Sequence, residues 1–246
     1  MRRIQSAEPV LRTLDKPKKI GIVMPAFNEE ENIGKVLESI KGNGFSPTDI
    51  IVVDDGSSDD TYNVACKANA HVVRHRINQG VGAALKTGYK QALKEGFDIV
   101  VLIDADGQHD PAEIKRILLP ILTGEADMTI GSRFLGSYQT MFFMRFLGIT
   151  WLNLLIRFIT NLKITDSTSG FRAITSTGLA VIDVRAKKHW AAEMIIEAWK
   201  RNLRIKEVPV NMKRRQSGTS FLSKKSTFWA YPLTVTFTIL KCLSRG

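Results

Sequence analysis

Cysteine is scarce in this sequence of 246 residues, and acidic residues and long apolar runs are also few. The two cysteines, Cys66 and Cys242, lie far apart and lack a C-x-x-C or Cys/His ligand spacing. A disulfide framework and a structural zinc site are therefore excluded as the basis of the fold, and free thiols are consistent with a reducing compartment. A chain of this length buries roughly 70 to 75% of its unfolded surface and needs neither.

No segment is long and apolar enough to read as a signal or a membrane span. Residues 1–17 form a basic N-terminal arm without an apolar h-region, so they do not predict a secretory signal, and we expect the protein on the cytoplasmic side. Ser226–Leu240 is uncharged but shorter than the roughly 20 residues that span a bilayer. Residues 221–246 are therefore expected to form a hydrophobic C-terminal appendage that is either interfacial or the beginning of a membrane region.

Acidic residues number 24 against 35 basic ones, which gives a net charge of +11 and a pI near 9.7. Such an excess predicts an anionic partner, either nucleic acid, membrane headgroups or a phosphorylated ligand. A solvated basic surface is the alternative. Much of the excess lies in the N-terminal arm and from Lys187 onward, whereas the carboxylate-rich motifs occupy the first half.

Short apolar runs alternate with helical patterns along the first half of the chain. Polar or glycine-rich loops bound each run, which predicts buried strands. Helical spacing follows at Ile33–Ile40 and at Ile114–Ile121, the latter after an Asp110-Pro111 helix start. The alternation predicts an α/β fold with a mostly parallel central sheet flanked by helices, and ligands beyond the carboxyl ends of its strands. The predicted strands are Ile20–Met24, Ile50–Val53, Val72–Arg74, Ile99–Ile103 and Met128–Ile130.

Met141–Thr160 is rich in Phe, Leu and Ile but contains two arginines, so a lipid-spanning helix is disfavoured. Thr150, Asn153, Arg157 and Thr160 share one helical face. The segment is therefore either an amphipathic helix at a membrane surface or a core helix with a polar face.

The strongest chemical signal is Asp104-Ala105-Asp106, directly after the predicted strand Ile99–Ile103. Alternate residues of an extended segment share a face, so the two carboxylates and the Gln108 amide oxygen are expected to converge. An all-oxygen set of this kind suits Mg²⁺ or Mn²⁺ that also binds substrate phosphates. His109 is a weaker candidate ligand, and we expect it to be structural.

Three other loops also follow predicted strands. Asp55, in DDGSSDDT, is a candidate nucleoside contact, because a carboxylate at a strand end can accept hydrogen bonds from a base or ribose. In PAFNE, Pro25 stiffens the exit from the strand and Phe27 is placed to pack beside a nucleobase. NQGVGAA lacks the third glycine of a dinucleotide fingerprint, which disfavours NAD.

Arginine recurs beside glycine or serine in three later loops, in the motifs GSR, DSTSGFR and RRQSGTS. Guanidinium forks, hydroxyls and backbone amides together bind phosphate. Each loop is a weak signal alone, but the three together favour a second anionic group near the metal.

Taken in order, PAFNEEENIG, VVDDGSSDDT, NQGVGAAL, DADGQHDP, GSR and DSTSGFR resemble the family 2 glycosyltransferases of the GT-A fold. Within that family they most resemble dolichyl-phosphate mannose or glucose synthases and bacterial polyprenyl-phosphate relatives. The resemblance covers about residues 18–220, which we take as the GT-A domain. Phe221 stands where lysine is frequent in the family, and some relatives carry complete transmembrane helices that this chain does not show.

The resemblance implies roles residue by residue. It implies an inverting transfer of a hexose from a UDP- or GDP-linked donor to a polyprenyl or dolichyl phosphate, with Mg²⁺ or Mn²⁺, at the cytoplasmic face of a membrane and without nucleic acid. The residues that would bind the donor are Pro25, Ala26, Asn28, Glu29, Asp55 and Asp104, and those that would bind the metal are Asp104, Asp106 and Gln108. The catalytic residues would be Asp106, Arg133, Arg172 and Arg215. The residues that would contact the acceptor phosphate are Arg133, Arg145, Ser169 and Arg172.

Two other functions stay open. The same fold could transfer sugar to a hydroxyl of a glycan or lipid, which would require a general base, and Asp166 and Glu193 are the candidates. A phosphate acceptor needs none, because it is already largely dianionic at neutral pH. The other alternative is a basic protein that binds membranes or nucleic acid without catalysis.

Overall fold

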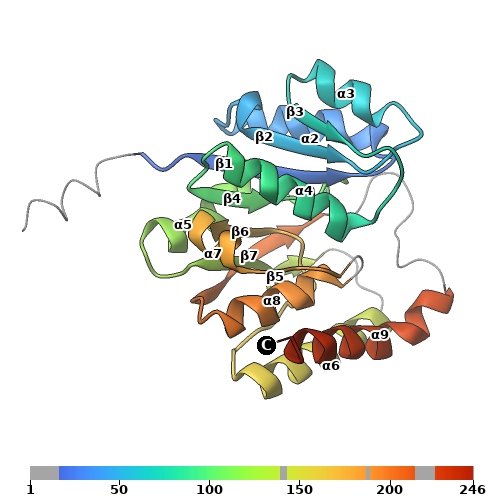
Figure 1. Ribbon diagram of the computed structural model, residues 1–246, viewed down its shortest axis with the longest axis vertical. Helices are drawn as coiled ribbons and strands as arrows, with labels where there is room; N and C mark the ends of the chain where they lie inside the picture. The colour runs from blue at the N-terminus through green and yellow to red at the C-terminus, as the bar shows by residue number, and fades with distance from the viewer. Residues whose placement is uncertain (1–16, 139–142, 187–188, 214–224, 246) are drawn as a thin grey trace, which may run out of the picture.

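The computed structural model describes residues 17–138, 143–186, 189–213 and 225–245. Its central feature is one twisted sheet with helices on both faces (Figure 1). The strands are β1 (Ile20–Ala26), β2 (Ile50–Asp54), β3 (His71–Arg74), β4 (Ile99–Leu102), β5 (Met128–Tyr138), β6 (Arg172–Thr175) and β7 (Ile205–Met212). The helices are α2 (Glu30–Gly42), α3 (Thr61–Lys67), α4 (Val81–Lys94), α5 (Ile114–Leu122), α6 (Phe143–Thr160), α7 (Ser176–Val181), α8 (Trp190–Lys200) and α9 (Lys225–Leu243), with short 3₁₀ turns at Pro47–Asp49 and Pro111–Glu113.

The sheet order in the described part of the chain is β3-β2-β1-β4-β6-β5-β7. All neighbours run parallel except β6, which pairs antiparallel with both β4 and β5. The five predicted strands are present, and β5 continues to Tyr138, with a register shift against β7 between Ser132 and Ser137. The predicted mostly parallel α/β sheet is confirmed.

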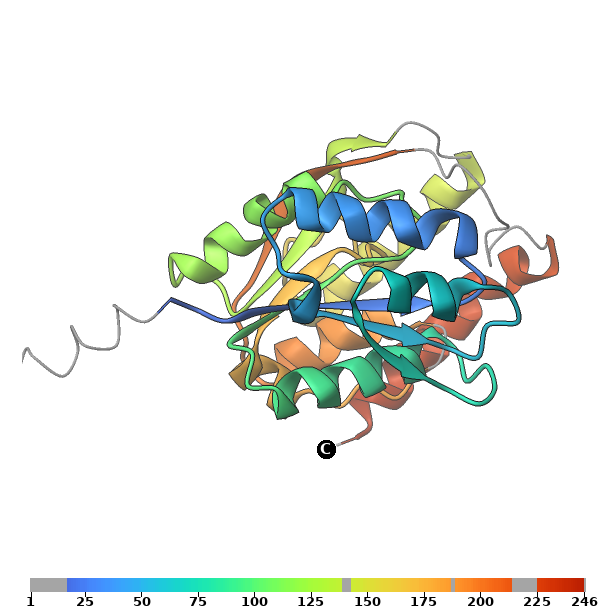
Figure 2. The same cartoon turned by 90° about the horizontal axis from the view of Figure 1, so that it is seen from above.

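Alternating side chains of the strands divide the core into two layers, because successive residues of a strand point to opposite faces. In β1, Ile22 and Met24 pack beneath α2, α3 and α5, whereas Val23 packs beneath α4 and α8. The view from above shows the sheet between these two helical layers (Figure 2). The sheet is buried on both faces, which explains why its central strands are continuous apolar runs.

Helix α9 is built into the second layer. Val235, Ile239 and Cys242 are buried in the same core cluster as α8. Lys200 of α8 donates to the Cys242 carbonyl, at 3.0 Å, and to the Arg245 carbonyl. The part of residues 221–246 that the structure describes therefore shares the core of the domain, and the boundary at residue 220 stays a prediction. Among the described residues, no helix combines the length and apolarity that crossing a membrane requires.

Candidate active site

The loops after β1 and β2 lie together at the carboxyl ends of these strands. The Asn28 N–H donates to Ser57 Oγ at 3.0 Å, and Asn28 Oδ1 accepts from the Ser58 N–H at 2.9 Å. Asn28 has a φ of 54°, in the left-handed region that asparagine tolerates. The Asp55 N–H donates to the Ala26 carbonyl at 2.8 Å. The two motifs therefore form one structural unit, as their positions after neighbouring strands predict.

Pro25 and Glu29 complete this unit from the first loop. Pro25 lies beside Val53 in the parallel ladder of β1 and β2. The Glu29 N–H donates to Thr61 Oγ1 at 2.8 Å, and its carboxylate accepts from Asn32 Nδ2 at 2.8 Å. Phe27 stays 44% exposed between these anchored neighbours. Its position agrees with the expectation of an aromatic side chain beside a nucleobase, which remains a prediction.

Asp55 holds the glycine-rich loop after β3. Its carboxylate, only 4% exposed, accepts from the backbone N–H of Gln79 at 3.0 Å and of Gly80 at 2.7 Å. His75 Nδ1 lies 2.7 Å from the same carboxylate, and His75 Nε2 lies 2.9 Å from Thr87 Oγ1. Sequence reasoning missed His75, whose only signal was its position directly after the strand. Asp55 therefore shapes the loop that lines the site in addition to any contact with a nucleoside.

The loops after β2 and β3 approach so closely that one position must be glycine. Gly56 has a φ of 75°, and a Cβ there would come 2.6 Å from the Ile77 carbonyl carbon. An open cavity of about 350 Å³ lies beside these loops, lined by Gly56, Ser57, Arg74, His75 and Arg76. The hollow places two arginines next to the predicted nucleotide loops.

The carboxylates predicted to bind metal lie just beyond β4, in the middle of the sheet. Asp104, Asp106 and Gln108 are each partly buried. The Gln108 N–H donates to Asp106 Oδ1 at 3.0 Å, which fixes the turn. A Cβ at Gly170 would come 2.6 Å from Asp104 Oδ2, so the backbone after Ser169 lies directly against this carboxylate.

These residues fit a divalent cation that shares its coordination with a substrate. Within the described residues, no group of three or more His, Cys, Asp or Glu side chains could hold a metal ion. Mg²⁺ in proteins is commonly bound through one or two carboxylates together with substrate phosphates. Two carboxylates and an amide at an open strand end match this arrangement.

His109 is structural, as expected. It is 3% exposed and its ring lies against Phe171, with centroids 5.0 Å apart. Burial, assisted by the Arg133 charge, lowers the pKa of His109 to about 3, so the ring is neutral at neutral pH. The predicted helix start is confirmed nearby, because Asp110 Oδ1 accepts from the Ala112 N–H at 3.1 Å.

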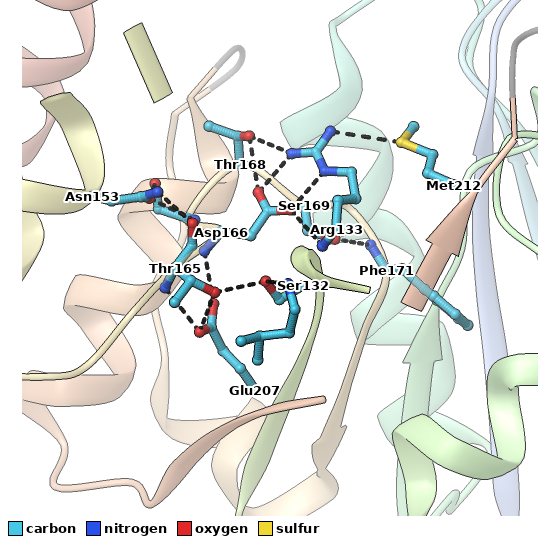
Figure 3. A network of polar contacts seen from close by, with 12 residues as sticks. Ser132, Arg133, Asn153, Thr165, Asp166, Thr168, Ser169, Phe171, Glu207 and Met212 are labelled. Atoms are coloured by element: carbon cyan, nitrogen blue, oxygen red, sulfur yellow. Dashed lines mark hydrogen bonds and ion pairs between the residues drawn. The ribbon is translucent and has the colours of Figure 1, made fainter. Parts of the chain in front are cut away.

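Arg133 is engaged by a buried carboxylate (Figure 3). The Arg133 Nε and one terminal nitrogen each lie 2.6 Å from a carboxylate oxygen of Asp166. The backbone N–H of Arg133 donates to Asp166 Oδ2 at 3.1 Å. The same terminal nitrogen donates to Thr168 Oγ1 at 2.6 Å. The side chains of Arg133 and Asp166 are 3% and 0% exposed. The structure thus joins the GSR and DSTSGFR motifs, but as a neutralised ion pair.

The segment that carries Asp166 is clamped from α6 and β7. Asn153 of α6 accepts from the Ser167 N–H at 3.0 Å and donates to the Thr165 carbonyl. Glu207 accepts from the N–H groups of Thr165 and Asp166, both at 2.8 Å, and burial raises the pKa of this carboxyl. These contacts hold the segment from Thr165 to Ser167 in place (Figure 3).

Arg172 begins β6 and is fully buried, contrary to its expected place in a loop. Its guanidinium donates to the carbonyls of Ser169, Ala191 and Ser167 at 2.9, 2.8 and 3.0 Å. Burial lowers the pKa of Arg172 to about 10, which leaves it charged at neutral pH. In this geometry Arg172 organises the segment Ser167–Ser169, so any effect on a phosphate is indirect.

The other predicted residues are placed as follows. Ser169 is 1% exposed and its Oγ accepts from the Phe171 N–H at 3.3 Å, beside Asp104 but facing inward. Arg215 and the side chain of Arg145 lie outside the described residues. Glu193, a candidate general base, is fully buried: it accepts from the Ala186 and Arg185 N–H groups and from Arg245.

Comparison with known proteins identifies the family. The description "Glycosyl transferase family 2" matches residues 21–180, which contain the loops after β1, β2, β3 and β4 and the GSR and DSTSGFR motifs. The chain belongs to this family. The family 2 glycosyltransferase predicted from the ordered motifs is therefore confirmed.

Several curated relatives act on lipid phosphates, judging by their names. A UDP-N-acetylglucosamine–dolichyl-phosphate N-acetylglucosaminyltransferase of Methanococcus voltae is 34% identical, over 78% of this chain and 85% of its own. A polyprenol monophosphomannose synthase of Mycolicibacterium smegmatis is 30% identical, over 89% and 83%. An uncharacterised protein of Methanocaldococcus jannaschii is 39% identical, over 78% and 80%.

Solved structures agree on the fold. Glucosyl-3-phosphoglycerate synthase of Mycobacterium tuberculosis, solved with Mn²⁺, UDP and glucosyl-3-phosphoglycerate, superposes with a TM-score of 0.73. The match covers 98% of this chain and 86% of that one at 23% identity. At this identity the likeness confirms the expected GT-A fold alone.

Proposed function

We propose that this protein transfers a hexose from a UDP- or GDP-linked nucleotide-sugar to a polyprenyl or dolichyl phosphate, with inversion at the anomeric carbon. Several relatives with at least 30% identity carry names of this activity class. The proposal includes Mg²⁺ or Mn²⁺ as the cofactor. It also includes the cytoplasmic face of a membrane as the place of reaction, because a lipid phosphate is held in a bilayer.

The observation that favours a phosphate acceptor is the state of the two candidate bases. A hydroxyl acceptor needs a positioned base within hydrogen-bond reach of its proton. Asp166 is fully buried and accepts three hydrogen bonds from Arg133, and Glu193 is fully buried on α8 beneath Arg245. Neither carboxylate is placed to take a proton. A phosphate monoester is already largely dianionic at neutral pH and attacks without such help.

The residues that would hold the metal are Asp104, Asp106 and Gln108, beside the donor loops. When bound, the metal supplies electrostatic stabilisation of the charge on the nucleoside diphosphate leaving group. The chain's own part is to fix the geometry. Gly170 lets the backbone lie against Asp104, and Asp55 holds the loop at Gln79 and Gly80 that would close over the nucleoside.

The acceptor phosphate oxygen attacks the anomeric carbon from the side opposite the leaving group, and the nucleoside diphosphate departs with the bonding electron pair. Arg133 and Arg172 act here by holding the segment around Ser169 beside Asp104. Arg215 and Arg145 are the remaining arginines proposed to meet the phosphates directly. The proposal predicts that removing the charge of Arg145 or Arg215 weakens acceptor binding more than it lowers the free energy of unfolding.

The test measures nucleoside diphosphate release from UDP- and GDP-hexoses with Mn²⁺ or Mg²⁺, with polyprenyl phosphate or with a hydroxyl acceptor. Asp106→Ala should abolish release, whereas Glu38→Gln, which alters an exposed carboxylate on α2, should not. Release that requires the lipid phosphate supports the proposal. Release with a hydroxyl acceptor alone would replace it with the second transferase function, and salt-sensitive nucleic-acid binding without turnover would favour a binding protein.

A further inference from the structure

Helix α6 is apolar on its outer side as well as on the side that packs into the core. Asn153 is 7% exposed and bonds Ser167, and Arg157 Nε donates to the Ile164 carbonyl at 2.7 Å. The outer side carries Leu147, Trp151, Leu154 and Phe158, spaced as one helical stripe. Their exposed fractions are 44%, 44%, 57% and 89%. Helix α6 therefore exposes an apolar stripe that the core does not cover.

Helix α9 adds to the same end of the molecule. It packs against α6 and α8 and exposes Phe237 and Leu240, by 68% and 57%. Both α6 and α9 lie at the end of the domain opposite β3 and α3 (Figure 1). Large contiguous apolar surfaces of this kind mark protein or membrane contacts.

The charge on these helices favours a membrane over a protein as the partner. The sequence contains no Asp or Glu between Met128 and Thr165 or after Glu207. Arg157, Lys163 and Lys241 are exposed on or next to the two helices. Aromatic and aliphatic side chains on helices that carry cations and no carboxylate match an anionic lipid surface. A second copy of this cationic face would meet like charge.

We propose that the outer faces of α6 and α9 form a monotopic seat on an anionic bilayer. This inference rests on the proposed function in one respect, since a lipid phosphate acceptor would be presented by that bilayer. The inner face of α6 lies on the other side of the seat. There Asn153 holds the Thr165–Ser167 segment, whose continuation at Gly170 lies against Asp104. Helix α6 and the Thr165–Gly170 segment therefore connect the seat to Asp104.

The first experiment measures sedimentation with vesicles of phosphatidylcholine, with and without phosphatidylglycerol, in the absence of donor and acceptor. The wild-type protein should sediment with the anionic vesicles. Trp151→Ser with Phe158→Ser should weaken partitioning about tenfold or more, because two aromatic anchors are lost. The matched control is Leu119→Ser with Leu122→Ser on α5, which removes residues exposed by 58% and 51% on the other helical layer.

The charge is tested with Lys163→Gln and Lys241→Gln together. Partitioning to anionic vesicles should fall about tenfold or more, with no change on neutral ones. Equal losses in the α5 control, unchanged partitioning of the aromatic variant, or self-association without vesicle binding would each overturn the seat. Because neither substrate is present, vesicle binding is measured independently of the transfer reaction. If the proposed function is wrong, this experiment still tests the seat.

A second readout joins the seat to turnover. The aromatic variant should keep wild-type kcat with a short, water-soluble prenyl phosphate and lose activity only toward a long-chain acceptor in vesicles, through a raised KM. An equal loss with the soluble acceptor would assign Trp151 and Phe158 to the site itself and contradict the seat.

Discussion

The buried pair of Arg133 and Asp166 predicts a large and specific loss of stability when it is broken. Asp166→Ala removes the acceptor of the Arg133 Nε, terminal nitrogen and backbone N–H, and leaves a guanidinium that is 3% exposed without its counter-charge. Breaking a buried pair in this way costs about 3–5 kcal/mol. A typical domain has about 5–15 kcal/mol in total, so the variant should unfold at much lower urea.

The chain contains a matched control in Asp127 and Arg204. Asp127 also accepts from the Nε, a terminal nitrogen and the backbone N–H of its arginine, at 3.0, 2.8 and 2.9 Å. The two side chains are 26% and 57% exposed. Solvent screens this pair, so Asp127→Ala should lose only about 0–1 kcal/mol. The contrast isolates burial, because the same three donor groups of the arginine bond the carboxylate in both pairs.

The decisive measurement is a double-mutant cycle by urea unfolding. Arg133→Met with Asp166→Leu should recover most of the stability lost in Asp166→Ala, because an apolar pair of similar size leaves no uncompensated charge. A double variant that is as unstable as the sum of its single changes, or a loss below about 1 kcal/mol in Asp166→Ala, would refute this reasoning.

Three further results are expected. His75→Phe should raise the donor KM about tenfold with kcat nearly unchanged, as measured by steady-state kinetics. The change removes the side chain that contacts the Asp55 carboxylate, and Asp55 in turn holds the glycine-rich loop. An effect on kcat alone would contradict this. Gly170→Ala should weaken Mn²⁺ binding about tenfold in a titration with nucleoside diphosphate present, at wild-type fold by circular dichroism, because its Cβ would displace Asp104. Burial lowers the pKa of His109 to about 3, so the stability that its neutral form contributes is complete above about pH 6.5 and is lost as the pH falls toward 3. In His109→Phe the free energy of unfolding should fall less steeply with pH, by up to about 1.4 kcal/mol per pH unit. An unchanged slope would exclude His109 as the titrating group.

Local patterns predicted the buried central strands of the sheet. The runs Ile20–Met24, Ile50–Val53 and Ile99–Ile103 are buried on both faces, so their apolar character alone identifies them as central parallel strands. The position of Asp104 and Asp106 beyond β4 was predicted in the same way, because a strand end delimits the loop that follows it, and their binding of a metal stays a prediction.

The antiparallel strand and its arginine could not be found by such reasoning. Arg172 looked like a loop residue because it follows Ser-Gly, yet β6 enters the sheet between β4 and β5 and buries the arginine against three carbonyls. Which carboxylate would neutralise Arg133 was also undetermined, since Asp166 lies 33 residues away in the sequence. Pairings between distant residues depend on the whole sheet.

The polar stripe of Met141–Thr160 is another feature that the sequence predicted only in part. Its periodicity was visible in the sequence, but a stripe does not say which side faces the protein. The orientation brings Arg157 and Asn153 to the Ile164–Ser167 segment, where Arg157 donates to the Ile164 carbonyl and Asn153 bonds the Thr165 carbonyl and the Ser167 N–H. Buried backbone groups need partners, so this side of α6 was turned inward together with Leu152 and Ile156, and a second apolar stripe was left at the surface.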